Sequence, residues 1–305
     1  MGTRQRYDGT LLKDISAFRK INPFVMRGRN ESAIYYTQLI EIEETHRFLK
    51  EYNRHRDREQ RISLFHVILA AMVRVIALRP QLNRFISGQR IYQRNRIQIA
   101  FIVKKDLSDD GDETNAKITF SPFDTLEHIR DRANVRVDEA RSMDGNESDR
   151  EIEFITRLPR GVINLIVAGW RLLDQYGIAP RSMIEMDPLY TSVYVANLGS
   201  VGLDAPFHHL YEWGNASIFV VIGRPKRHLL PVGNGHFESR LAIELKYTLD
   251  DRVTEGYYAA RALSLFRDFI REPQVLLDPP DLSPELLDEL ALTAAPEAEP
   301  EAEPE

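Results

Sequence analysis

The hydrophobic pattern of the chain alternates between strand-like and helix-like segments. Residues 32–42 are rich in β-branched and aromatic side chains and partly alternate with polar ones, which is typical of a strand. Residues 63–78 are almost wholly apolar and stop before Pro80, which predicts a buried helix that ends ahead of the proline. Between them, residues 43–56 are predicted to form a helix with a polar face. The chain therefore begins as a mixture of α and β structure.

The rest of the chain continues this mixture. Residues 84–92 and 97–104 are predicted to form a strand pair joined through residues 93–96, and residues 106–115 read as an acidic loop. The remaining predicted elements are strands over residues 116–121, 189–196, 216–222 and 238–248, and helices over residues 124–141, 158–173 and 257–270.

No linker composition divides residues 10–281, so we expect one α/β core domain over residues 1–281. A short amphipathic helix with a proline near its start is expected over residues 282–292. Residues 293–305 are a low-complexity tail of alanine, glutamate and proline that cannot bury apolar area. We therefore expect that tail to be disordered.

Composition narrows the class of protein. The 305 residues are 43% hydrophobic and 28% charged, which suits a globular protein with a substantial core. A net charge of −6 gives no reason to expect a nucleic-acid partner. The absence of cysteine excludes disulfides, thiolate metal sites and a cysteine nucleophile. The N-terminus lacks a signal-peptide core and the apolar run at residues 162–170 is too short to span a bilayer, so we expect a cytoplasmic protein without a membrane partner.

The most informative motif is residues 249–256, Leu-Asp-Asp-Arg-Val-Thr-Glu-Gly, between a predicted strand and the last predicted helix. It resembles the Asp-His-Arg-x-x-Asp-Gly signature of the acyltransferase (E2) core of 2-oxo acid dehydrogenase complexes, and chloramphenicol acetyltransferase carries a related signature. Asp251 stands at the position of the histidine and Glu255 at that of the second acid. Arg252 and Gly256 are retained.

Three further segments resemble the same family in the expected order and spacing. Residues 62–84 resemble its helix followed by a Pro-x-Leu-Asn turn, residues 194–199 its Ser-Asn-Leu-Gly turn, and residues 217–223 the strand that ends in glycine. The resemblance covers roughly residues 10–281. Residues 158–188 exceed the standard core.

The resemblance implies a fold and an assembly. The fold is the chloramphenicol acetyltransferase-like, CoA-dependent acyltransferase two-layer α/β sandwich, with a mixed sheet and flanking helices. The assembly is a homotrimer with active sites between subunits, and a larger cage is possible if residues 282–292 bridge trimers. No cofactor is certain, and coenzyme A or acyl-CoA is possible by resemblance. The lipoyl domain of a full E2 chain is not expected in this chain.

The resemblance also implies which groups do the chemistry. In the family, a histidine deprotonates the thiol and a serine or threonine hydroxyl binds the oxyanion. These positions fall on Asp251 and Ala196, whereas Asn197, Gly199 and Arg252 keep the residues that shape the turns. Loss of a general base costs about 10²–10⁴ in rate, and loss of an oxyanion donor about 10²–10³. A carboxylate of ordinary pKa about 4 is also a weak base for a thiol.

We therefore interpret the chain as a divergent E2-like acyltransferase-fold protein whose standard catalysis is lost or altered. It would act as an oligomeric scaffold or bind an acyl- or CoA-type ligand. The alternative is an active acyltransferase that uses Asp251, Glu255, His208 or His209 as its base. For the two histidines, a simpler interpretation is a loop pair bonded to the backbone or to Glu212. No third ligand nearby supports a metal site.

Three smaller features have plain structural interpretations. The basic clusters at residues 27–29 and 224–227 could meet CoA phosphates, but surface charge explains them equally. His66 is interpreted as a hydrogen-bonded core histidine. The glycines of residues 199–202 lack the spacing of a phosphate loop and indicate a turn that needs flexible backbone.

Overall fold

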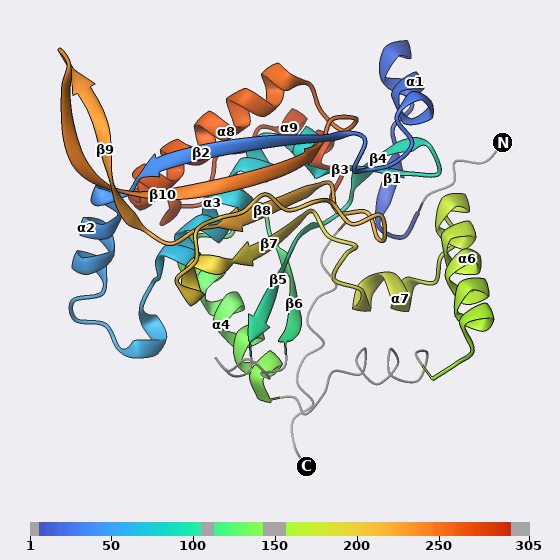
Figure 1. Ribbon diagram of the computed structural model, residues 1–305, viewed down its shortest axis with the longest axis horizontal. Helices are drawn as coiled ribbons and strands as arrows, with labels where there is room; N and C mark the ends of the chain where they lie inside the picture. Colours follow the sequence, from blue (N-terminus) through green and yellow to red (C-terminus); the bar gives the residue numbers. More distant parts are fainter. Residues whose placement is uncertain (1–5, 105–112, 143–156, 294–305) are drawn as a thin grey trace.

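The main sheet confirms the predicted mixed α/β fold. The computed structural model describes residues 6–104, 113–142 and 157–293 (Figure 1). Its seven-stranded sheet has the order β2-β10-β8-β7-β5-β6, with β9 paired to β10. β7 runs parallel to both β5 and β8, and the other pairs are antiparallel. The strands are β2 (Ala33–Glu41), β5 (Ile97–Lys104), β6 (Glu113–Phe120), β7 (Val193–Asn197), β8 (Ile218–Ile222), β9 (Lys226–Gly233) and β10 (His236–Asp250).

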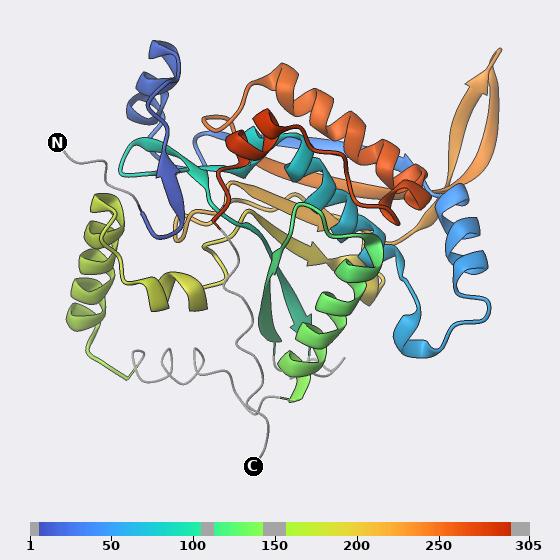
Figure 2. The same cartoon turned by 180° about the vertical axis from the view of Figure 1, so that it is seen from behind.

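Helices cover one face of this sheet, as Figure 2 shows. Residues 67–77 of the central helix are all buried, which agrees with the almost wholly apolar sequence. Ser63 and His66 form a reciprocal capping box at its first turn. His66 is therefore hydrogen-bonded as interpreted, but it lies at the partly exposed start of the helix and not in the core. The helices of this layer are α2 (Glu43–Tyr52), α3 (Leu64–Leu78), α4 (Leu126–Ser142), α8 (Gly256–Arg271) and α9 (Pro284–Leu290).

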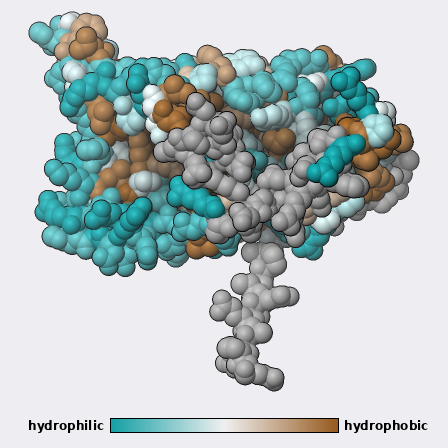
Figure 3. Space-filling view, turned by 60° about the horizontal axis from the view of Figure 1, so that its bottom comes forward, coloured by the Kyte–Doolittle hydropathy of each residue, from teal (hydrophilic) through white to brown (hydrophobic). Residues whose placement is uncertain are grey.

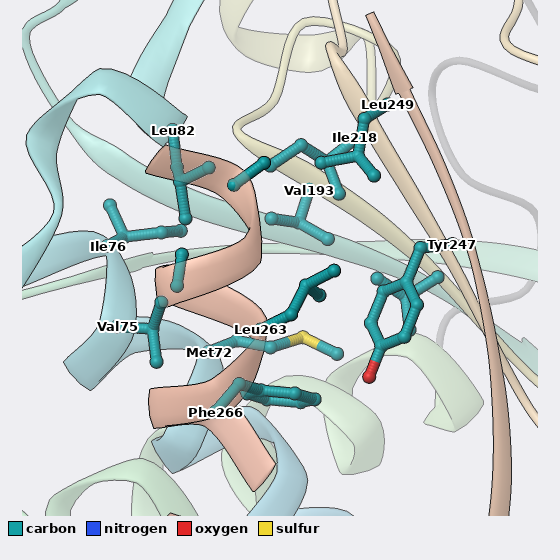
Figure 4. Close-up of a pocket in the computed structure, with 13 residues that line it drawn as sticks. Met72, Val75, Ile76, Leu82, Val193, Ile218, Tyr247, Leu249, Leu263 and Phe266 are labelled. Atoms are coloured by element: carbon teal, nitrogen blue, oxygen red, sulfur yellow. The ribbon is translucent and has the colours of Figure 1, made fainter. Parts of the chain in front are cut away.

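The apolarity of α3 is explained by its place in the core. Within the described residues, the helical stretch Arg58–Leu78 is long and apolar enough to cross a membrane by length and composition alone. However, 67% of its most apolar window is buried inside the protein. Side chains of α3, α8 and the sheet converge there on an apolar void of about 50 Å³ (Figure 4). A void of that size holds no more than a few water molecules.

The predicted pairing of residues 84–92 with 97–104 is wrong. β3 (Arg84–Ser87) instead pairs with β4 (Arg90–Arg94) in a tight hairpin, while β5 pairs with β6 and β7. Gly88 and Gln89 both have positive φ, at 53° and 56°, which is the conformation of a two-residue hairpin turn. The pattern hid this turn because Gly-Gln is a weak turn signal between apolar positions.

The hairpin belongs to a second, three-stranded sheet of order β1-β4-β3. It lies at one end of the main sheet, near α1 and α6 (Figure 1). Several elements here and nearby were not predicted, because they are short or contact the core through few residues. These missed elements are β1 (Gly9–Leu11), α1 (Ala17–Val25), α7 (Arg181–Met186) and β9. The helix predicted over residues 158–173 forms as α6 (Arg160–Tyr176), which ends three residues later than predicted. The described residues also form single-turn 3₁₀ helices at Arg58–Gln60, Pro80–Asn83, Leu198–Val201 and Pro273–Leu276.

The short C-terminal helix forms as expected but packs on its own chain. Leu290 of α9 is 0% exposed, and Glu289 pairs with Arg84 at 3.1 Å. Leu286 packs against the main core cluster. Part of the apolar side of α9 is therefore already buried, whereas Leu287 is 38% exposed. The acidic tail predicted over residues 293–305 lies outside the described residues apart from Thr293.

Candidate active-site turn and the neighbouring cavity

The turn between β10 and α8 is built around a buried ion pair. Asp250 is 0% exposed and Arg252 is 2% exposed. The Arg252 guanidinium donates from Nε and Nη2 to the two carboxylate oxygens of Asp250 at 2.8 and 2.7 Å. Its Nη1 donates to the carbonyl oxygens of Met26 and Arg27 at 2.9 and 3.0 Å. Arg252 thus fixes the turn to the segment that follows α1.

Asp251 takes no part in that pair. Its backbone N–H donates to the Ser32 carbonyl oxygen at 2.9 Å, and its side chain is exposed. Within the described residues, the Asp251 carboxylate has no hydrogen bond or ion pair. The position that would carry the base in the resembling family therefore holds an exposed carboxylate that no neighbouring side chain orients.

Glu255 is engaged elsewhere. It is the N-cap residue of α8, with a side chain that is 75% exposed. Arg19 of α1 pairs with it at 3.1 Å and also donates to the Val253 carbonyl oxygen at 3.2 Å. The Glu255 carboxylate therefore links α1 to the start of α8 at Gly256.

Ala196 near the end of β7 faces away from the helical layer. Its methyl group is 8% exposed and belongs to a cluster with Phe219 and Val221 of β8. Asn197 ends the strand, and Gly199 lies so close to Gly223 that a Cβ there would be 2.5 Å from the Gly223 carbonyl oxygen. The turn needs its glycine, as expected, and no hydroxyl is present at position 196.

His208 lies over the same face of the sheet as Ala196. Its ring stacks on Phe219 with centroids 3.9 Å apart and an interplanar angle of 8°. Its Nδ1 is 2.7 Å from the His209 carbonyl oxygen, and Nδ1 of His209 is 2.9 Å from that of Leu210. Both imidazoles are thus bonded to backbone, and burial lowers the pKa of His208. In the part of the chain that the structure describes, no group of acidic or imidazole side chains could hold a metal ion.

A cavity of about 470 Å³ lies next to the turn. It is open to one side and lined by α6, the β3–β4 turn, the segment after α1 and the loop ahead of β8. The stacked rings of Trp170 and Trp213, 6.1 Å apart, form part of its wall. The polar residues that line it include Arg27, Arg29, Ser87, Arg171, Asp174, Glu212 and Arg252.

No sequence pattern points to this cavity, because its lining residues lie far apart in the chain. Arg27 and Arg29 belong to one of the basic clusters, and Trp170 and Arg171 lie in residues 158–188, which the resemblance leaves outside the standard core. The other basic cluster is ordinary surface charge, because Arg224 and Lys226 pair with Asp204 at 3.1 and 2.8 Å.

The mixed sheet, its single helical layer and the strand–turn–helix around Arg252 define a class of protein, the chloramphenicol acetyltransferase-like acyltransferase fold. Residues 21–108 match the family model described as 2-oxoacid dehydrogenases acyltransferase (catalytic domain). The resemblance noted in the sequence is thereby confirmed. No curated protein sequence matches the chain.

Solved structures agree on the fold. The cubic core of the pyruvate dehydrogenase multienzyme complex is similar over 87% of this chain and 94% of that one, with 14% identity and a TM-score of 0.56. A dihydrolipoamide acetyltransferase from Azotobacter vinelandii gives 15% identity, the same two coverages and a TM-score of 0.55. A chloramphenicol acetyltransferase gives 14% identity, 87% and 98% coverage and a TM-score of 0.52. At these identities the likeness shows a shared fold.

Proposed function

We propose that this protein is a divergent E2-like member of the acyltransferase fold that has lost standard acyl transfer. It acts through its core, residues 1–281, as a homotrimeric scaffold or as a binder of an acyl- or CoA-type ligand. One contrast carries the proposal. The Asp250–Arg252 pair that shapes the turn is buried and bidentate, whereas the Asp251 carboxylate beside it is exposed and without a side-chain partner.

The chemistry of the two changed positions supports this. The Azotobacter vinelandii structure was used to study a serine, a histidine and an asparagine in the catalytic mechanism of that enzyme. By the resemblance of the motifs, Ala196 stands where the serine hydroxyl would be and Asp251 where the imidazole would be. A methyl group donates no hydrogen bond to an oxyanion. A second negative charge beside a developing thiolate opposes its formation.

A second candidate function is acyl transfer with a relocated base. The Nδ1 contact of His208 with a carbonyl oxygen requires its proton on Nδ1, which leaves the lone pair on Nε2. This is the tautomer that a general base uses. The ring also lies over the face of the sheet that carries Ala196. His208 is therefore the group on which this candidate depends.

Acyl transfer from acetyl-CoA to dihydrolipoamide separates the candidates. We expect no turnover in the natural protein or in Asp251→Ala, and at most a trace in Asp251→His. Turnover that disappears in Asp251→Ala would refute the proposal in favour of a carboxylate base. Turnover that survives in Asp251→Ala but disappears in His208→Ala would establish the relocated base. Sedimentation analysis tests the trimer, since a monomer would contradict the scaffold role.

A further inference from the structure

The cavity beside the turn exists because α6 is docked at one end. Arg6 donates from Nη1 to the Asp174 carbonyl oxygen and from Nη2 to the Asp174 carboxylate, both at 2.7 Å. Ser87 of β3 donates to the same carbonyl oxygen at 3.0 Å. The last turns of α6 are thus held firmly, and Trp170, one turn earlier, is 6% exposed against the body.

The rest of α6 stands away from the core. Its outward side carries Val162, Leu165 and Leu172, which are 42%, 73% and 54% exposed. Apolar surface is visible at this end of the molecule in Figure 3. α6 therefore acts as one wall of a cavity rather than as a core helix.

The charges that line this cavity do not balance. Asp250 pairs with Arg252 and Arg6 pairs with Asp174, both at 2.7 Å, and Arg6 is shared with Asp8 at 2.8 Å. Among the described residues, the lining arginines are Arg27, Arg29, Arg171 and Arg252, and the lining acids are Asp174 and Glu212. Glu212 accepts from the backbone N–H groups of Arg29 and Asn30 rather than from a guanidinium. The cavity therefore carries an excess of positive charge.

Arg29 is a buried arginine of this lining that has no directly paired carboxylate among the described residues. It is only 8% exposed, and within the described residues its guanidinium has no carboxylate in ion-pair distance. Nη1 donates to the Tyr211 carbonyl oxygen at 3.1 Å and Nη2 to that of Ile86 at 3.5 Å, while the buried Nε has no partner. A buried guanidinium without a directly paired anion is costly, because the longer-range attraction of Asp250 and Glu212 does not replace an ion pair. The site therefore lacks an anionic partner.

The opposite part of the wall is aromatic. Trp170 donates from Nε1 to the Tyr190 hydroxyl at 2.9 Å, and Trp213 donates to Asp187 at 2.6 Å. Because both indole N–H groups are satisfied inside the protein, the rings present apolar surface to the cavity. A volume of about 470 Å³ is within the range of small-molecule sites.

We propose that this cavity binds a small ligand that joins an anionic group, a carboxylate or a phosphate, to a planar ring. Arg29 anchors the anion, Arg27 and Arg171 attract it, and the tryptophan pair contacts the ring. Guanidinium groups suit this task because their fork of donors matches both anions. The inference does not rest on the proposed loss of acyl transfer, since binding here requires no base.

The chain provides its own probe, because its only tryptophans, Trp170 and Trp213, both line the cavity. Tryptophan emission of the whole protein is titrated with phenyl phosphate and phenylacetate. Benzyl alcohol serves as the ring without the anion, and inorganic phosphate as the anion without the ring. We expect a saturable change with at least one aromatic anion, and binding at least about tenfold weaker for both partial probes. The stronger of phenyl phosphate and phenylacetate identifies the anion.

Variants assign the effect to the cavity. Arg29→Gln should weaken binding of the aromatic anion at least about tenfold. Arg171→Gln changes an exposed lining residue, keeps the fold, and should weaken it about twofold to fivefold. Arg47→Gln on α2, outside the cavity, is the matched control and should have no effect. No saturable signal with either aromatic anion would overturn the proposal. So would equal binding of benzyl alcohol, or unchanged affinity in both Arg29→Gln and Arg171→Gln.

Discussion

Of two neighbouring aspartates, only Asp250 should lose much stability when it is replaced by asparagine. Asp250→Asn removes the charge that pairs with Arg252 while keeping the shape of the side chain. The structure places both partners at 2% exposure or less, joined by two hydrogen bonds of 2.7 and 2.8 Å. Breaking such a buried pair typically costs about 3–5 kcal/mol, because the remaining charge is left uncompensated.

A second cation adds to that cost. Asp250 also attracts Arg29 at longer range without pairing with it, so the substitution removes a negative charge that stabilises a second buried guanidinium. Asp251→Asn changes an exposed carboxylate without a described side-chain partner, and surface changes of this kind stay within about 0.5 kcal/mol. The two variants therefore test whether Asp250 has a structural role that Asp251 lacks.

Urea unfolding measures the stability change in both variants. The protomer concentration is kept the same, because association of subunits would otherwise shift the midpoint. With slopes of about 1–3 kcal/mol per molar urea, Asp250→Asn should lower the midpoint by at least about 1 M, and Asp251→Asn should leave it nearly unchanged. Equal midpoints for the two variants would show that the ion pair does not hold the turn. A large loss in Asp251→Asn would show that this carboxylate has a partner in the assembled protein.

Three further predictions concern the framework of the fold. Burial lowers the pKa of His66 from 6.5 to about 4, so the unfolded chain binds more protons between those values and stability falls as pH drops through that window. His66→Gln keeps the capping box and should therefore reduce this pH dependence. The check is the difference in the free energy of unfolding between pH 7 and pH 5, and a difference equal to that of the natural protein would refute the role of His66. Gly88→Ala should destabilise the fold by more than about 2 kcal/mol, because its Cβ would lie 2.1 Å from the Gln175 carbonyl oxygen. Gly202→Ala is the control, because Gly202 also has positive φ but faces open space, and it should cost only about 1 kcal/mol. Equal losses of unfolding free energy in the two glycine variants would mean that the α6 backbone at Gln175 moves away from the added methyl group at little cost. Glu255→Gln should change the free energy of unfolding by less than about 1 kcal/mol, since its pair with Arg19 is largely exposed on the acid side, and a larger loss would show that the link to α1 is essential.

Long, strongly patterned segments were the most predictable part of the molecule. The apolar run that became α3 and the strand that became β2 were found within a residue or two of their ends, because burial on one or all sides leaves a clear period in the sequence. The hairpin at Gly88 was misplaced and α1 was missed. Tight backbone geometry and a helix with Phe18 and Val25 at 73% and 72% exposure leave no such period.

The class of fold could be read from the sequence, and the resemblance of its motifs is what singles out Asp251 and Ala196 as the positions where we propose that the chemistry has changed. The sequence could not show which aspartate pairs with Arg252, because two adjacent carboxylates differ only in the burial that the packed fold gives them. Only the tertiary structure placed Arg29 beside the tryptophans, since residues nearly two hundred positions apart meet only when the helical layer, the hairpin and α6 pack together.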